Sequence, residues 1–302
     1  MPRRRTIGRL LPLAWIVATF ACLHDEAPAA GGGDGPLANE AFKQHWFDGR
    51  AELTRYALEQ SRYGENHEGH AVLVFVTEDF DAEKQVKADH PGTASVPAMK
   101  LNFTKSFLTG IYPYSIMTSV FQPLDGGGGD GLRALKTTTS VQEWCGHTFF
   151  QINRRKDRYR AVGYSYFESE GDRSTELGDA WLEDDLWVRI RTQPERLPTG
   201  MLRVVPSGEA IRLLHLDPKP LDAEAVLADE GDSREYSLRY RELGRTLTIR
   251  FETAFPYRIE GWTETTRGGV TRAQRTHFER LAYWSLNGAD DRAVRERLGL
   301  PR

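Results

Sequence analysis

The feature that most constrains the fold of this chain is an alternation of apolar and polar residues with a period of two. Leu247, Ile249 and Phe251 alternate with polar neighbours, and a similar stretch ends at Tyr240, across a short turn at 243–245. Successive side chains of a strand point to opposite faces, so this pattern predicts an antiparallel hairpin with one buried face.

Further strands are expected between tight turns elsewhere in the chain. Residues 257–266 and 271–284 form a second candidate hairpin, and the unbroken apolar run at 71–76 predicts a strand covered on both faces. Residues 50–62 include good helix formers, but their threonine and tyrosines favour a long strand paired with that run. Strands that follow one another through short turns predict neighbours in one sheet.

Few helices are expected. Short ones are predicted at 37–46 and 290–298, a helical turn at 222–228, and a solvated acidic turn at 183–185 ahead of a strand at 186–191. The predicted fold class is therefore mainly β: a single antiparallel, meandering and curved sheet, resembling a half-barrel, with short N- and C-terminal helices.

The first thirty residues carry the pattern of an export signal. A basic segment at 3–5 precedes an apolar run at 10–21, which is too short to span a bilayer as a helix. Ala21 before Cys22 is similar to a bacterial lipobox, which predicts cleavage before Cys22 and acylation of its thiol. The alternative is ordinary signal cleavage after Ala29. Both place the mature protein outside the cytoplasm, either anchored by a lipid on the periplasmic side of a membrane or soluble.

The predicted organisation is a signal peptide at 1–29, a glycine-rich flexible linker at 30–36 and a single β-rich domain at 37–302. The chain of 302 residues has a net charge of −3 and interleaved acids and bases, so no nucleic-acid partner is expected. It has two cysteines. Acylation or removal of Cys22 leaves Cys145 alone, which excludes an internal disulfide.

The densest chemistry lies at 142–149. In a continuous strand, Glu143, Cys145 and His147 would share one face, and Cys145 and His147 would form a candidate nucleophile and base. Trp144-Cys145-Gly146-His147 also resembles the start of a thioredoxin-type motif, but Thr148 replaces the second cysteine, so no dithiol cycle is available.

A third hypothesis joins Cys145 and His147 to His67 and His70 as ligands of a zinc ion, although the spacing is not that of a known zinc motif. The structural alternative is that Cys145 is a small buried apolar residue, that Trp144 packs in the core, and that Glu143 and His147 form a hydrogen-bonded pair on the sheet. The alternative favoured here is structural, with no metal and no cofactor expected.

One resemblance covers roughly the whole mature chain and is densest before Asn153. It is carried by Trp46–Leu53, Tyr56, Glu59–Gly64, Val76–Phe80, Lys100–Lys105, Gly110–Ser115 and Gln142–His147. Together these segments resemble an uncharacterised family of bacterial secreted proteins and lipoproteins, some of whose members are labelled septum formation inhibitor Maf. True Maf proteins are cytoplasmic nucleotide pyrophosphatases with a Ser-x-Ser-Pro-Arg-Arg segment, which this chain lacks. The resemblance implies export and supplies no catalytic residue.

Two functional hypotheses follow. In the first, a concave apolar face lined by Tyr112, Tyr114, Trp144 and Phe149, beside the Glu143, Cys145 and His147 segment, binds a hydrophobic small molecule or an envelope protein without catalysis. This half-barrel would be similar to periplasmic lipoprotein carriers in architecture only. In the second, the protein is an envelope hydrolase or metal-dependent enzyme that uses Glu143, Cys145 and His147.

Overall fold

The structure is a computed structural model that describes residues 35–90, 92, 94–125 and 132–301. These residues belong to one compact unit, which begins at Asp34. The predicted signal peptide, both cleavage sites, the acylation site Cys22 and most of the predicted linker lie outside the described residues.

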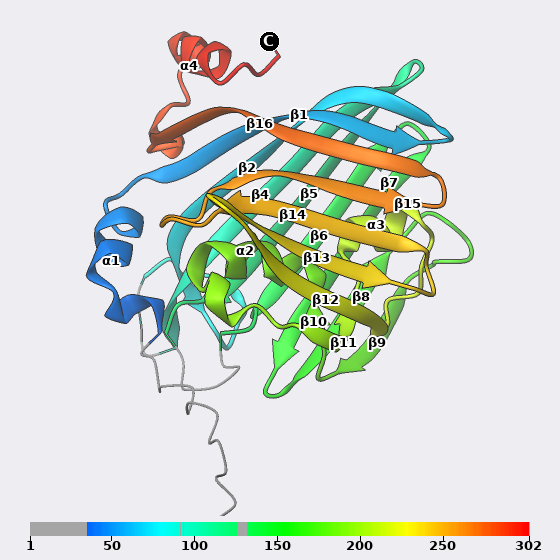
Figure 1. Ribbon diagram of the computed structural model, residues 1–302, viewed down its shortest axis with the longest axis horizontal. Helices are drawn as coiled ribbons and strands as arrows, with labels where there is room; N and C mark the ends of the chain where they lie inside the picture. Colours follow the sequence, from blue (N-terminus) through cyan, green and yellow to red (C-terminus); the bar gives the residue numbers. More distant parts are fainter. Residues whose placement is uncertain (1–34, 91, 93, 126–131, 302) are drawn as a thin grey trace, which may run out of the picture. The chain divides into compact units, whose positions relative to one another are not determined.

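One sheet contains all sixteen strands found in the described residues (Figure 1). The first half of the sheet comprises β1 (Ala51–Arg62), β2 (Glu65–Asp81), β3 (Val86–Lys87), β4 (Ser95–Thr109), β5 (Tyr112–Pro123), β6 (Lys136–Glu143), β7 (Gly146–Arg155), β8 (Arg158–Tyr164) and β9 (Arg173–Gly178). The second half comprises β10 (Trp181–Leu182), β11 (Gly200–Val205), β12 (Leu221–Glu230), β13 (Ser233–Tyr240), β14 (Arg245–Glu252), β15 (Ile259–Thr266) and β16 (Gly269–Leu281).

The strands meander, as the sequence predicts. Their order is β10-β11-β12-β13-β14-β15-β16-β1-β2-β4-β5-β6-β7-β8-β9, with β3 added beside β2. Every pairing is antiparallel except that of β10 with β11. The two outermost strands, β9 and β10, are joined through residues 179–180 but do not pair with each other, so the curved sheet stays open at that seam. The predicted mainly β, single curved sheet is confirmed.

The strand predictions hold at several particular places. The ambiguous segment 50–62 is strand β1, and it pairs with β2 across a tight turn in which Tyr63 and Gly64 both have positive φ. Such a turn matches the twist of the flanking strands and tolerates glycine at low cost. The predicted helical turn at 222–228 is wrong, because this segment forms β12 and pairs on both sides.

Four of the turns between strands lie at the same end of the strands, which we call the turn end. They are residues 63–64, 110–111, 144–145 and 267–268. The described chain starts at the opposite end of the strands. A Cβ on Gly35 would lie 3.3 Å from the carbonyl oxygen of Leu124, which directly follows β5.

Short helices occur at both ends of the described chain, as expected. Near its start the 3-10 turn Pro36–Ala38 leads into α1 (Glu40–Trp46), and near its end the 3-10 turns Tyr283–Ser285 and Ala289–Asp291 precede α4 (Arg292–Arg297). Leu298, which follows α4, packs with Ala51, Leu53 and Val76 in a small separate cluster. The second face of the strand at 71–76 is therefore covered at Val76, while Val72 and Val74 stay half-buried, so the predicted cover on both faces holds only in part.

The most consequential difference from the sequence prediction is helix α2 (Glu183–Thr192), where a solvated turn and a strand were expected. All ten of its residues are buried. Three acidic residues in its first turn complement the positive end of the helix dipole, and Pro194 follows its last turn, starting the 3-10 turn Pro194–Arg196. The sheet curls around this helix, which contacts β4, β5 and β10 (Figure 1).

Aromatic side chains hold α2 against both halves of the sheet. The Trp187 ring lies 5.0 Å from that of Phe103 on β4 and 5.2 Å from that of Trp262 on β15, both edge to face. Aromatic side chains bury more surface per residue than other apolar side chains and therefore contribute strongly to the stability of a core. The interior of the sheet is therefore a packed core and not an open cavity along α2.

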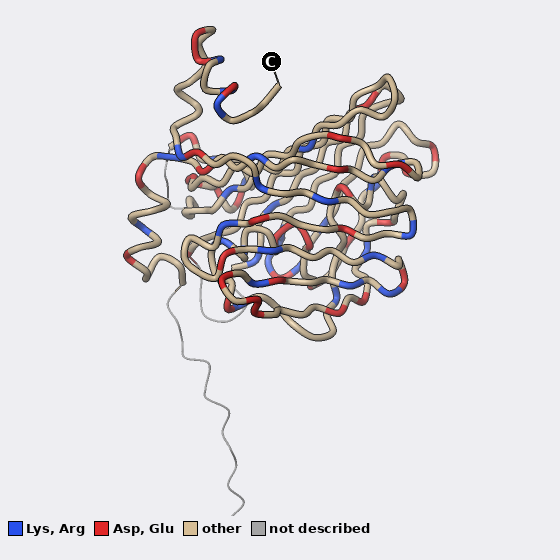
Figure 2. The backbone as a smooth tube through the Cα atoms, turned by 45° about the horizontal axis from the view of Figure 1, so that its top comes forward, with Lys and Arg blue, Asp and Glu red and all other residues tan. Residues whose placement is uncertain are grey.

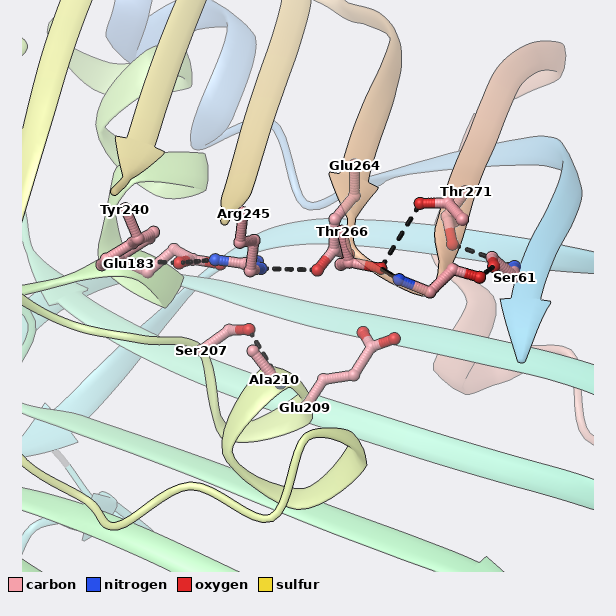
Figure 3. A network of polar contacts seen from close by, with 12 residues as sticks. Ser61, Glu183, Ser207, Glu209, Ala210, Tyr240, Arg245, Glu264, Thr266 and Thr271 are labelled. Carbon is pink, nitrogen blue, oxygen red and sulfur yellow. Dashed lines mark hydrogen bonds and ion pairs between the residues drawn. The ribbon is translucent and has the colours of Figure 1, made fainter. Parts of the chain in front are cut away.

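Charged side chains also occupy this interior. Arg245 on β14 donates two hydrogen bonds of 2.6 Å to Glu183 and a third of 2.6 Å to Glu264, while Tyr240 donates to Glu183 (Figure 3). On the facing strand β4, Lys105 donates to Glu209 at 2.8 Å. Bidentate geometry and complete hydrogen bonding are what make such a buried pair tolerable.

Asp184 belongs to the same interior and gives a first testable prediction. Burial raises the pKa of Asp184 from 3.8 to about 7, and its carboxylate accepts a hydrogen bond from the Gly208 amide. Between these two values the folded protein binds more protons than the unfolded one, so this group makes stability fall as pH rises. We expect Asp184→Asn to remove that fall and to stabilise the protein at pH 8 by on the order of 2 kcal/mol.

Urea unfolding at pH 5 and pH 8 measures this effect. Asp222→Asn serves as the control, since the Asp222 side chain is 73% exposed in a surface ion pair with Arg203. An Asp184→Asn variant with the wild-type pH dependence would contradict the prediction.

Basic and acidic residues are interspersed along the strands (Figure 2). No helix in the described part of the chain has both the length and the apolar character needed to cross a membrane.

Candidate functional site

A pocket lies between the short helix α3 (Gly208–Leu213) and the inner face of strands β6 to β8. Its cavity measures about 40 Å³ and opens to solvent. Apolar side chains make up most of its wall, among them Val141, Phe150, Ile211, Leu216 and Pro218. The loop between β8 and β9 forms another side. Apolar walls with a few polar groups are typical of small-molecule sites, but this cavity is much smaller than the roughly 300–1,000 Å³ of most such sites.

Local sequence features fix α3 against the sheet. The Ser207 hydroxyl caps the helix by accepting a hydrogen bond from the Ala210 amide at 3.1 Å. A Cβ on Gly208 would lie 2.1 Å from the Thr139 hydroxyl, so only glycine permits the helix to approach β6 this closely. The close packing of α3 on β6 therefore fixes the position of this part of the pocket wall.

Arg212 is the charged side chain that α3 contributes to the pocket. It is 6% exposed, and its guanidinium carbon lies 4.2 Å from the centre of the Phe167 ring. Nη2 lies 3.5 Å from Glu143 Oε1, whereas Nε and Nη1 are buried without a hydrogen-bond partner. Buried donors that lack a partner are rare in folded proteins and call for an explanation. The sequence analysis did not identify Arg212.

The predicted strand through 142–149 is wrong, and with it the predicted alignment of three reactive side chains. The chain turns at Trp144 and Cys145, so that Glu143 pairs with Gly146, and His147 pairs with Gln142. His147 therefore shares a face with Gln142 and is exposed, while Glu143 points inward and is 7% exposed. The two residues lie on opposite faces of the sheet.

Cys145 itself lies in this turn as an exposed free thiol. Its backbone amide donates to Glu143 Oε2 at 2.5 Å, and the hydrogen bond of the thiol with the Glu143 carboxylate raises the pKa of Cys145. A thiol held in its protonated form is a poor nucleophile. The thiol contacts Glu143, whereas His147, the base of the hydrolase hypothesis, lies on the opposite face of the sheet from Glu143.

This geometry gives a second prediction. In a Cys22→Ser background, where Cys145 is the only thiol, we expect Glu143→Gln to speed alkylation by iodoacetamide at pH 7.5 several-fold, because the neutral amide no longer opposes the thiolate. Glu176→Gln is the control, since that side chain is 70% exposed on β9. A rate in the Glu143→Gln variant that is unchanged or lower would show that the carboxylate does not control the thiol.

The zinc hypothesis is also contradicted by the topology. His67 and His70 lie on β2, which is separated from β6 by β4 and β5. At about 4.8 Å per strand, the two strands are roughly 14 Å apart. His67 contacts the Arg62 carbonyl instead, at 3.1 Å. In the described part of the chain, no three histidine, cysteine, aspartate or glutamate side chains are arranged to hold a metal ion.

Three of the four predicted aromatic residues, Tyr112, Tyr114 and Trp144, gather at the turn end, outside the wall of the α3 pocket. Tyr112 lies 6.3 Å from Trp144 between ring centres, and its hydroxyl donates to that of Tyr63. Trp144 is 68% exposed and Cys145 is exposed as well, so the structural alternative that buries both residues is wrong. We call Tyr63, Tyr112 and Trp144 the aromatic rim. Tyr114 is buried beneath it, and its hydroxyl lies 2.9 Å from that of Tyr63. Phe149 is the predicted aromatic residue that does line the pocket.

The fold and the pocket define a class of protein: an open, curved antiparallel sheet around a buried helix, with a small apolar site at one side. No family model matches the chain, and no curated protein matches it. Among solved structures it is similar to the crystal structure of a beta-barrel-like protein of a domain of unknown function, DUF1849, from Brucella abortus. The match has 6% sequence identity and a TM-score of 0.47 and covers 76% of this chain and 96% of that one. The resemblance to exported proteins stays a prediction.

Proposed function

We propose that this protein is an exported, non-enzymatic binding protein of the bacterial envelope that holds a hydrophobic small molecule. The observation that carries the proposal is the pocket under α3, in which apolar side chains from two strands, the helix and the following loop face one solvent-accessible cavity. Burial of apolar ligand surface there is favourable by about 25 cal/mol per Å².

Export is part of the proposal and rests on the sequence. The basic, apolar and small-residue segments of the first thirty residues support it, and Cys22 is the candidate acylation site for a membrane anchor. Labelling cells with an alkyne fatty acid tests the anchor, because label retained in a Cys22→Ala variant would refute acylation at that residue.

The alternative of an envelope hydrolase has less support. It requires Glu143, Cys145 and His147 on one surface, and the turn at 144–145 places His147 on the opposite face from Glu143. The raised pKa of Cys145 also works against a nucleophilic role. An envelope protein as the partner, in place of a small molecule, stays a separate hypothesis.

A variant that fills the pocket tests the binding proposal. Gly163 on β8 lines the cavity, and a Cβ there would meet Phe150 at 3.4 Å and Arg173 at 3.7 Å, which are ordinary contacts. Gly163→Val therefore adds bulk at the pocket without a backbone clash. We expect solvent extraction and mass spectrometry to find an apolar or amphiphilic molecule in wild-type protein purified from its envelope, and to find much less of it in Gly163→Val.

Ala57→Val is the matched control, because Ala57 is exposed on β1, away from this pocket. It should retain the wild-type ligand content. Equal content in the wild-type protein and Gly163→Val, with both folded by circular dichroism, would refute this pocket as the binding site.

A further inference from the structure

The pocket under α3 combines an apolar wall with hydrogen-bond donors that are not used. Arg212 is more than nine-tenths buried, and two of its three guanidinium nitrogens, Nε and Nη1, have no hydrogen-bond partner. A buried charged donor without a partner destabilises the folded protein, because it has given up its hydration and gained no acceptor. A ligand that supplies an acceptor at this position would recover that cost.

The other charged groups of the wall are already engaged. Arg173 donates to the carbonyls of Ser169 and Glu170 and to the Asp217 carboxylate. The two carboxylate oxygens of Glu170 contact the Ser165 hydroxyl at 2.9 Å and His215 Nδ1 at 2.5 Å. Among the three charged side chains of the wall, Arg173, Glu170 and Arg212, only Arg212 has buried polar atoms without a hydrogen-bond partner, and both of those atoms are donors.

Glu143 does not satisfy Arg212. One of its oxygens accepts the Cys145 amide at 2.5 Å, and the other lies 3.5 Å from Nη2, which is long for a charge-assisted hydrogen bond. Glu143 lies beside the guanidinium but leaves Nε and Nη1 without an acceptor.

We infer that this pocket binds the carboxylate headgroup of an amphiphilic ligand through Arg212, and that the apolar wall takes the first carbons of its tail. The inference rests on the proposed function and adds the chemical class of the ligand. A carboxylate is an acceptor-only group whose two oxygens can satisfy two N–H groups. The cavity of about 40 Å³ suits a headgroup and a few carbons, so a longer tail extends into the open mouth.

The test compares three ligands with the same tail in calorimetric titrations of the mature protein: octanoate, methyl octanoate and 1-octanol. We expect octanoate to bind at least about 10-fold more tightly than either neutral compound, because a charge-assisted hydrogen bond is roughly twice as strong as a neutral one. Equal affinity for octanoate and methyl octanoate would overturn the role of the charge. No measurable binding of octanoate would overturn the inference, while the ligand content of Gly163→Val separately decides the proposed function.

Substitution of the arginine completes the test. Arg212→Met keeps most of the aliphatic stem and should abolish the preference for octanoate while leaving 1-octanol binding within about twofold, since the apolar wall is unchanged. Arg203→Met is the control, because Arg203 is 60% exposed on β11 and pairs with Asp222. A preference for octanoate that survives in a folded Arg212→Met variant would exclude Arg212 as the headgroup ligand.

Discussion

Arg245→Leu is expected to lower the free energy of unfolding by about 3–5 kcal/mol, the cost of removing one partner of a buried ion pair. The Arg245 and Glu183 side chains are 2% and 1% exposed, and their contact is bidentate. Glu264 receives a third hydrogen bond from the same guanidinium. The substitution would therefore leave two carboxylates inside the sheet without their cation. Urea unfolding at pH 7 measures the loss.

Arg241→Leu provides a matched control in the turn of the same hairpin, between β13 and β14. Arg241 pairs with Glu224, but the two side chains are 69% and 37% exposed. Exposed ion pairs contribute roughly 0–1 kcal/mol, so this variant should unfold close to the wild-type midpoint. Similar losses in the two variants would mean that the interior cluster does not stabilise the fold.

Trp187→Ala is the second large effect, with an expected loss of about 3–5 kcal/mol. Trp187 is 4% exposed on α2, and its ring packs between those of Phe103 and Trp262. Truncation leaves a cavity between the helix and both halves of the sheet, where close packing prevents collapse. Denaturant unfolding with near-ultraviolet circular dichroism follows both the stability and the aromatic packing.

Trp284→Ala is the comparison for this variant, because Trp284 is 50% exposed in the short turn after β16. Its loss should stay below about 1 kcal/mol, as is usual for surface positions. If Trp187→Ala were as stable as Trp284→Ala, α2 would not be the packed centre of the domain.

Much of the sheet could be predicted from local sequence. The hairpin of β13 and β14 follows directly from the alternation around 243–245, and its register pairs Leu238 with Leu247. Segment 50–62 shows the limit of this reasoning, since its helix-forming residues are overridden by pairing on both sides, with β2 and β16.

Helix α2 could not be predicted because its acidic start resembles a solvated turn. Glu183, Asp184 and Asp185 are buried because their partners come from distant parts of the chain. Arg245 pairs with Glu183 across 62 residues, and Asp185 accepts from the Ala134 amide across 51 residues. Partners so far away in the chain cannot be identified from the local sequence.

The candidate site was missed for related reasons. The turn at 144–145 has no glycine or proline at its two central positions, so the segment resembles a continuous strand. Because the chain turns there, Glu143 and His147 lie on opposite faces, whereas a continuous strand would place them on the same face. One feature of the sequence could have drawn attention to Arg212: it is the one charged residue among the apolar residues Ile211, Leu213 and Leu214. Its lack of partners became visible only when Glu143 and Phe167 were placed beside it.

The most direct test of binding under α3 is photo-crosslinking of the purified mature protein with a medium-chain fatty acid that carries a diazirine in its tail, followed by peptide mapping. We expect labels on residues 148–165 and 208–218 that are competed by octanoate and much reduced in Gly163→Val. Labels confined to other surfaces, such as the aromatic rim, or labels that do not change in Gly163→Val would contradict this expectation.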